Sequence, residues 1–128
     1  MVIELRDLSA PKIARLGEQI REQAQRIAAE TKTEIAMKQV AHHDPALATP
    51  DVQKSIEAAC ARLGLKSERL PSGAGHDAQA MATVGPMGMI FVPSVGGISH
   101  SPKEFTPWED CARGAQVLLE TVLERAAA

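Results

Sequence analysis

The chain has 128 residues, of which 45% are hydrophobic and 23% charged, and its formal net charge is −2. This is the length of one modest domain, and such a chain folded alone buries only about two-thirds of its unfolded surface, which excludes a large enzyme core. Because 14 basic residues meet 16 acidic ones, the charge pattern does not indicate nucleic-acid binding. One Trp, two Phe and no Tyr also leave little material for stacking on bases.

The start of the chain has no basic stretch followed by an apolar run, so we expect no signal peptide. No apolar stretch is long enough to span a membrane. The two cysteines, Cys60 and Cys111, both fall within helical patterns and do not form a CxxC pair. We therefore predict two buried thiols in a reducing compartment, the cytoplasm, with neither nucleic acid nor membrane as a partner.

Residues 2–41 have the pattern of a strand, a helix and a second strand. Residues 2–6 are short and rich in β-formers, and residues 33–41 alternate polar with apolar, as half-buried strands do. Between them we predict a helix, with Ser9 as N-cap and Pro11 in the first turn. Its apolar residues recur every three or four positions, at Ile13, Leu16, Ile20, Ala24 and Ile27.

Residues 42–50 contain two prolines and form a connector, our predicted boundary between two halves. A second helix is predicted to begin with Thr49 as N-cap and Pro50 at its first position, and to end at Gly64. Its apolar stripe is Val52, Ile56, Ala59 and Leu63. A short strand over 67–70 follows.

Residues 71–82 are predicted to form a glycine-bearing loop that runs into a helix. The apolar run 87–93 is typical of a strand buried on both faces. After a second glycine-rich loop over 94–105, a capping box from Thr106 to Glu109 predicts the start of a last helix. The inner face of that helix is predicted as Cys111, Ala115, Leu118 and Val122. The α-β-α-β-α order over 50–125 predicts an α/β fold with a parallel sheet covered by helices.

The two glycine-rich loops each carry a histidine, His76 beside Asp77 and then His100. Each loop follows a predicted strand, and ligands of open α/β sheets bind at that end of the strands. A histidine there can ligate a metal or move a proton, but it can equally be an ordinary surface group. For the doublet at 42–43 we prefer the surface interpretation. A zinc site normally needs three or four protein ligands, so the residues alone do not show a complete catalytic site.

Several segments resemble one family. They read LPSGAGHDA at 70–78, MIFVPS at 89–94, GISHSP at 97–102 and FTPWEDCA at 105–112, and IELRD at 3–7 fits the same family. They are similar to the C-terminal part of the amidase/hydantoinase/carbamoylase family, which includes N-carbamoyl-L-amino acid hydrolases, allantoate amidohydrolases and β-ureidopropionases. These belong to the dinuclear-metal hydrolases that are like aminoacylases and carboxypeptidases.

The resemblance implies a role for five residues. His100 corresponds to a metal ligand, and Gly75 and His76 correspond to the substrate pocket, with Asp77 supporting them. Arg6 corresponds to the arginine that binds the substrate carboxylate, a task that suits the guanidinium fork. Without the resemblance, Arg6 would be taken for an ordinary surface charge. No catalytic acid or base is assigned to this chain.

The resemblance also implies a division into 1–43, part of a lid and dimerisation domain, and 44–128, the C-terminal part of a metallohydrolase catalytic domain. The expected fold is thus a fragment of a zinc-hydrolase fold, a β-α-β half-lid followed by α-β-α-β-α. Full-length relatives are much longer, and their other metal ligands lie on segments that precede this chain. A divalent metal (Zn, Mn or Co) is implied for the complete enzyme, with an incomplete or absent site here.

By this resemblance, the function is that of a metal-dependent amidohydrolase of linear C–N bonds in N-carbamoyl or ureido acids, here as a truncated piece that is inactive alone. The expected partners are a small carboxylate-bearing substrate and either further copies of the chain or a complementing N-terminal chain. Three alternatives stay open. The chain is a subunit of a split enzyme, a non-catalytic remnant that oligomerises through exposed apolar surface, or a regulatory carboxylate binder near Arg6 and His76.

Overall fold

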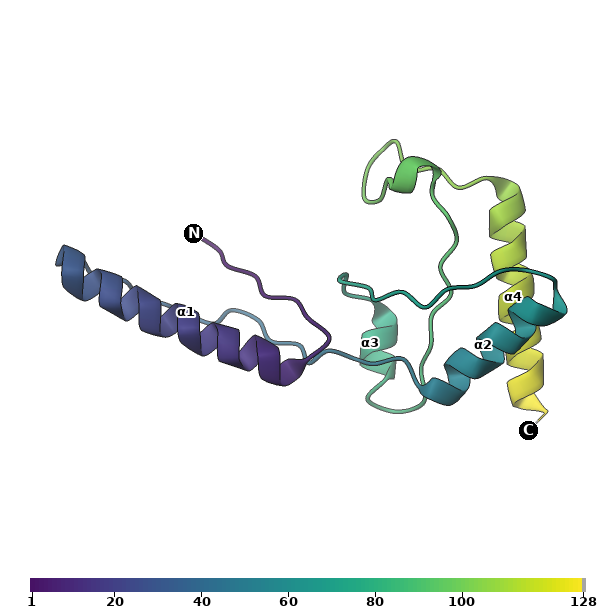
Figure 1. The fold of residues 1–128 in the computed structure, drawn as a ribbon, viewed down its shortest axis with the longest axis horizontal. Coiled ribbons are helices and arrows are strands. Elements are labelled where there is room, and N and C mark those ends of the chain that lie inside the picture. The colour runs from purple at the N-terminus through teal and green to yellow at the C-terminus, as the bar shows by residue number, and fades with distance from the viewer. Residues whose placement is uncertain (128) are drawn as a thin grey trace. The chain divides into compact units, whose positions relative to one another are not determined.

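The computed structural model describes residues 1–127, which contain four α-helices and one short 3-10 helix (Figure 1). In chain order these are α1 (Ala10–Thr31), α2 (Pro50–Arg62), α3 (Asp77–Met81), η1 (Val95–Gly97) and α4 (Trp108–Ala126). Within the described residues, none of these helices is long and apolar enough to cross a membrane. The chain forms two compact units: unit 1 is 1–47 with 71–75, and unit 2 is 48–70 with the residues from 76 onward.

Unit 1 is built around α1, whose predicted start is confirmed. The Ser9 Oγ accepts the Lys12 N–H at 3.4 Å, and an Asp7 carboxylate oxygen accepts the Ser9 N–H at 3.0 Å. A hydrogen bond from the Lys12 ammonium holds the pKa of Asp7 below its ordinary value. These bonds satisfy N–H groups that a helix start leaves without intrahelical partners.

The apolar stripe of α1 is present but uncovered. Met1 and Ile3 lie along the stripe and form a shallow groove of about 330 Å³ with Leu16, Ile20 and Ile27. No residue of α1 is buried. The predicted period of the helix is therefore right, while the burial that such a stripe normally indicates is not found within the described part of the chain.

Unit 2 holds the small core of the molecule, where α2 packs on α4. Ala59 is fully buried, and Cys60 and Val117 are nearly so. At the edge of this contact the Arg62 guanidinium donates to Glu124 at 2.7 Å and lies 3.6 Å from Glu120. Two helices that are far apart in sequence are thus joined by apolar packing and an exposed ion-pair cluster.

The segment 87–93 is held close to both helices by two glycines. A Cβ added to Gly88 would lie 2.6 Å from a methyl carbon of Val52 on α2. A Cβ added to Gly114 on α4 would lie 2.5 Å from a methyl carbon of Val92. At one end, the Thr49 N–H donates to the Met87 carbonyl at 2.7 Å. Only a residue without a side chain permits so close an approach at these two positions.

The predicted parallel sheet is not confirmed. None of the segments 2–6, 33–41, 67–70 and 87–93 forms a strand, and the residues described contain no strand at all. A strand exists only when its backbone N–H and C=O groups pair with a neighbouring strand. The sequence pattern shows which segments favour an extended backbone, but it does not supply the neighbour.

Two predictions about α4 are wrong. The helix begins one residue later than the capping box implied, because the Pro107 carbonyl accepts the first helical bonds, from Asp110 and Cys111. Its buried residues are Val117 and Thr121, whereas the predicted inner face lies elsewhere. The helix is apolar on more than one side, and periodicity alone does not tell which side meets α2. Cys111 is also only half-buried, while Cys60 is buried as predicted.

Two helical glycines should respond in opposite ways to the same substitution. Gly17→Ala is expected to stabilise α1 by up to about 1 kcal/mol, because alanine is the better helix former and no heavy atom lies within 4 Å of the added Cβ. Gly114→Ala makes the same gain but forces Val92 aside, and overpacking of this kind costs about 1–3 kcal/mol. Hydrogen exchange measured on each helix separately tests the pair, and equal stabilisation of both helices would contradict it.

The ion pairs of unit 2 predict a loss of stability in acid. The Arg62 hydrogen bond holds the pKa of Glu124 below its ordinary value of 4.5, and Arg69 does the same for Glu57. A carboxylate whose pKa is lowered by folding stabilises the fold above its unfolded pKa, and this contribution disappears as the pH falls through the folded value.

We therefore expect Glu124→Gln to reduce the difference in urea midpoint between about pH 6 and about pH 3. Glu68→Gln is the control, since the structure shows no ion pair for Glu68 among the described residues. The ion pair between Arg62 and Glu124 lies at an exposed position, so the expected effect is modest. An unchanged pH dependence in the Glu124 variant would contradict the assignment.

Candidate functional site

Arg6 is joined to the first glycine-rich loop within unit 1. Its Nη1 donates to the Gly73 carbonyl at 2.7 Å, which links two segments that are 67 positions apart in sequence. The remainder of its guanidinium faces Glu4, whose Oε1 lies 2.9 Å from Nε and 2.6 Å from Nη2. Arg6 thus already holds one carboxylate through its fork while it contacts the loop. The Arg6 side chain as a whole is about half exposed.

The loop that Arg6 contacts has open space at Gly75. No heavy atom lies within 4 Å of a Cβ built at Gly75, and the residue is exposed. The Ser72 Oγ accepts the Ala74 N–H at 3.3 Å, which closes the turn that comes before it. A glycine with open space around it lets a small ligand approach the backbone closely.

His76 and Asp77 belong to unit 2 and begin the short helix α3. His76 is the N-cap residue, and its carbonyl accepts the Gln79 N–H at 2.9 Å. Its ring meets Phe91 edge-on, with the ring centroids 5.7 Å apart and the planes at 67°. This contact fixes the ring against the apolar segment 87–93. The sequence did not single out Phe91, because an apolar run shows no preference among its members for a loop histidine.

His100 lies in the second glycine-rich loop, also in unit 2. It is exposed and adopts a left-handed backbone with φ of 53°, a conformation that costs a non-glycine residue about 1–3 kcal/mol. Its N–H donates to Glu104 Oε2 at 2.8 Å. The loop is closed further along by the Val95 N–H, which donates to the Phe105 carbonyl at 2.8 Å. Glu104 is a support that the sequence analysis missed, since a glutamate in a polar loop carries no signal of its own.

The residues that the structure describes do not make a complete metal site. His100 is a suitable donor, but no group of three or more His, Cys, Asp or Glu side chains is gathered in a way that could hold a metal ion within residues 1–127. His42 lies beside Asp44, with Nε2 and Oδ1 3.1 Å apart, at an exposed position. Residues 1–127 therefore do not form a metal centre by themselves.

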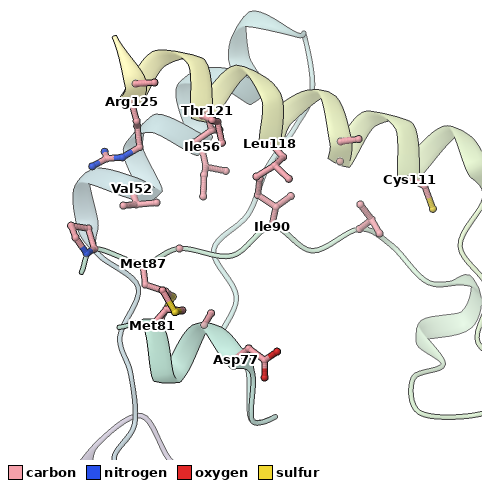
Figure 2. Close-up of a pocket in the computed structure, with 18 residues that line it drawn as sticks. Val52, Ile56, Asp77, Met81, Met87, Ile90, Cys111, Leu118, Thr121 and Arg125 are labelled. Atoms are coloured by element: carbon pink, nitrogen blue, oxygen red, sulfur yellow. The ribbon is translucent and has the colours of Figure 1, made fainter. Parts of the chain in front are cut away.

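Unit 2 contains an apolar groove of about 1050 Å³, shown in Figure 2. Val52 and Ile56 of α2 and Leu118 of α4 line one part, and Asp77 and Met81 of α3 line another. The segment from Pro86 to Val92 crosses the groove between them. The predicted inner face of α4 lines this groove and does not take part in the core.

Comparison with known proteins identifies the family. The sequence model of the family described as "Peptidase family M20/M25/M40" matches residues 5–124. The chain belongs to this family. Its members are generally dependent on divalent metals. The resemblance to the hydantoinase/carbamoylase group is confirmed, because similar proteins and similar solved structures include members of that group.

Among the relatives, an N-carbamoyl-L-amino acid amidohydrolase of Geobacillus stearothermophilus is 41% identical over 125 residues, which is 98% of this chain but 31% of that protein. A ureidoglycolate hydrolase of Arabidopsis thaliana is 36% identical over 94% of the chain and 25% of its own length. A solved amidase of the hydantoinase/carbamoylase family from Burkholderia multivorans is 35% identical, with a TM-score of 0.85 over 95% of this chain and 30% of that one. The chain spans less than a third of each.

Proposed function

We propose that this M20-family chain carries part of the substrate- and metal-binding apparatus of an amidohydrolase that cleaves linear C–N bonds in N-carbamoyl or ureido acids. The observation that carries the proposal is the hydrogen bond between Arg6 and Gly73. It puts a guanidinium fork beside an open glycine loop in unit 1. A fork beside open backbone suits a small ligand that bears a carboxylate.

Each proposed site residue has one task. Arg6 binds the substrate carboxylate, Gly75 leaves room for the substrate backbone, and His76 forms part of the pocket wall with its ring fixed by Phe91. His100 is the proposed ligand of a divalent ion, Zn, Mn or Co. Such an ion polarises a carbonyl and activates water when several ligands hold it. Residues 1–127 contain no group of three or more possible ligands, so the proposed site needs further ligands from another part of the enzyme.

We propose the domain division on the same family resemblance. Residues 1–43 are assigned to a lid and dimerisation domain, and 44–128 to the C-terminal part of the catalytic domain. We further propose that 67–70 and 87–93 become strands of a parallel sheet when the rest of the fold is present. The cytoplasm remains the proposed compartment, on the sequence argument given above.

The proposal is tested by complementation. The 128-residue chain should not hydrolyse an N-carbamoyl-L-amino acid in the presence of Zn²⁺, Mn²⁺ or Co²⁺. Coexpressed with the part of the Geobacillus stearothermophilus relative outside its 125-residue match, it should give a metal-dependent hydrolase. Hydrolysis by the chain alone, or a well-formed complex without any activity toward carbamoyl and ureido acids, would overturn the proposed function.

A second candidate is a non-catalytic protein that oligomerises. The observation in its favour is the number of exposed apolar side chains on one helix, since Leu118, Leu119, Val122 and Leu123 of α4 are all more than half exposed. Apolar surface of this kind marks interaction sites. Light scattering on the purified chain separates the candidates: a stable homo-oligomer that excludes the complementing part would favour this second function.

A further inference from the structure

Glu4 occupies the guanidinium fork of Arg6 that the proposed function assigns to the substrate. We propose that Glu4 is an internal competitor: its carboxylate holds the fork in the free protein and gives way to the carboxylate of an N-carbamoyl or ureido acid. Glu4 thereby sets the affinity of the site for its substrate. The inference rests on the proposed role of Arg6, and it adds a residue that neither the sequence motifs nor the proposed site includes.

The contact between Glu4 and Arg6 uses an edge of the guanidinium that can bind a carboxylate through two parallel hydrogen bonds. Glu4 Oε1 lies 2.9 Å from Nε and 2.6 Å from Nη2, and Nη1 donates to the Gly73 carbonyl at 2.7 Å. Every guanidinium nitrogen is thus engaged before a ligand arrives. A substrate carboxylate that binds bidentately along the Nε–Nη2 edge must therefore take the place of the Glu4 oxygen.

Arg6 is held in place by contacts that do not involve Glu4. The hydrogen bond from Nη1 to Gly73 ties the guanidinium to the glycine-rich loop of unit 1. The backbone beside Arg6 is fixed to the start of α1, because the Asp7 carboxylate accepts the Ser9 N–H at 3.0 Å. Both ends of Arg6, the guanidinium and the backbone, thus stay anchored when Glu4 leaves the fork.

The Glu4 side chain can leave the fork at little cost. It is 66% exposed, and within residues 1–127 its carboxylate has no hydrogen bond or ion pair apart from those with Arg6. An exposed ion pair of this kind is weak, and its loss changes an equilibrium by at most about fivefold. The competition is therefore strong enough to be measured and too weak to exclude the substrate.

The competition affects the product as well as the substrate. Cleavage of the linear C–N bond in an N-carbamoyl-L-amino acid leaves an amino acid that keeps its carboxylate. Glu4 competes with this group in both molecules, so it weakens substrate binding and favours release of the product. A ligand without a carboxylate does not engage the fork, and its affinity should not depend on Glu4. This dependence on the charge of the ligand distinguishes competition from structural support.

Ligand binding to the full 128-residue chain, without metal, tests the inference independently of activity. The probes are N-carbamoyl-L-alanine and its neutral amide, and the NMR signals of the Arg6 Nε–H and the Glu4 carboxyl carbon report on the fork. The ionic strength is kept constant, because added salt alone weakens exposed ion pairs. We expect the acid to shift both signals along one binding curve, with the Glu4 signal approaching that of an unpaired glutamate. The amide should shift neither.

Two glutamates of unit 1 provide matched variants. Glu4→Gln should bind the acid about two- to fivefold more tightly than the wild type does, while Glu18→Gln should bind it as the wild type does. Glu18 is 67% exposed and, like Glu4, pairs with an arginine, since Arg21 lies 2.6 Å away. Glu4→Ala should also bind the acid more tightly, because Arg6 keeps its contact with the loop. Arg6→Ala should lose the binding.

Three results would overturn the inference. The first is weaker binding of the acid by either Glu4 variant, because Glu4 would then position Arg6. The second is an affinity that neither Glu4 variant changes. The third is an acid that binds without moving the Glu4 signal of the wild type, or that does not bind even the Glu4→Gln chain.

The proposed function and the role of Glu4 can fail separately. If the Glu4 variants bind the acid more tightly but the complemented protein is inactive, the proposed function fails and the competition stands. If the complemented protein is active and the Glu4 variants bind the acid no more tightly, only the inference about Glu4 fails.

Discussion

In the complemented protein, His100→Ala is expected to weaken the binding of a divalent metal by more than about 100-fold, because loss of a ligand should exceed the 10–100-fold cost of losing a residue that only orients one. Competition with a chelator, followed at fixed pH, measures the affinity. His43→Ala is the matched control. Its histidine is exposed and lies in the connector, where no metal role is proposed.

His100 also has an unusual backbone, so the alanine variant changes two things at once. Its left-handed φ of 53° is a conformation that alanine tolerates poorly and asparagine tolerates well. His100→Asn therefore keeps the loop while removing the imidazole. If the asparagine variant retained full metal affinity while the alanine variant lost it, His100 would be a support of the loop and not a ligand.

The helix boundaries could be predicted where local chemistry sets them. The start of α1 follows from Ser9, whose side chain bonds the next turn, and the end of α2 follows from Gly64, which takes a left-handed φ of 68°. The predicted start of α2, with Thr49 as N-cap, is also confirmed, but the physical reason differs from the one expected. Thr49 is the N-cap, but its hydroxyl accepts from the Met87 N–H and does not cap the helix.

The strands could not be predicted in the same way, because they depend on partners. Segment 87–93 has the composition of a doubly buried strand, yet among the described residues only Met87 of this segment has a hydrogen bond to another backbone group. The face of α4 that meets α2 was missed for a related reason. A helix that is apolar on several sides can pack against several neighbours, and periodicity does not tell which side packs against which neighbour. Both cases concern surfaces whose neighbours lie far away in sequence or outside the chain.

The candidate site likewise combines features that the local sequence indicates with contacts that it does not predict. Arg6 was singled out only through the family resemblance, since it is an ordinary residue by composition. The glycine-rich loop drew attention to His100 from the residues alone, and the resemblance added the specific role of metal ligand. The contact between Arg6 and Gly73 spans 67 positions and no local rule predicts it. Glu104, which holds the backbone of His100, was missed because its role depends on the fold of one loop.

Substitution of Arg6 is expected to have the largest effect on substrate binding in the complemented protein. Arg6→Ala removes the fork, and hydrogen bonds to charged groups contribute about 1.5–3 kcal/mol each, so KM for an N-carbamoyl-L-amino acid should rise by at least about tenfold. Arg6→Lys should recover only a part, because an ammonium keeps the charge and loses the bidentate geometry.

The matched control for this prediction is Arg26→Ala. Arg26 lies on α1, is as exposed as an ordinary surface arginine, and has Glu30 at 3.7 Å as its ion-pair partner. A substrate amide that lacks the carboxylate provides the decisive comparison. The wild type and the Arg6 variants should bind it equally weakly, since the fork then has nothing to hold. If Arg6→Ala raised KM for the acid and the amide alike, the role of Arg6 would be to hold the 71–75 loop through Gly73, and the substrate carboxylate would be bound elsewhere.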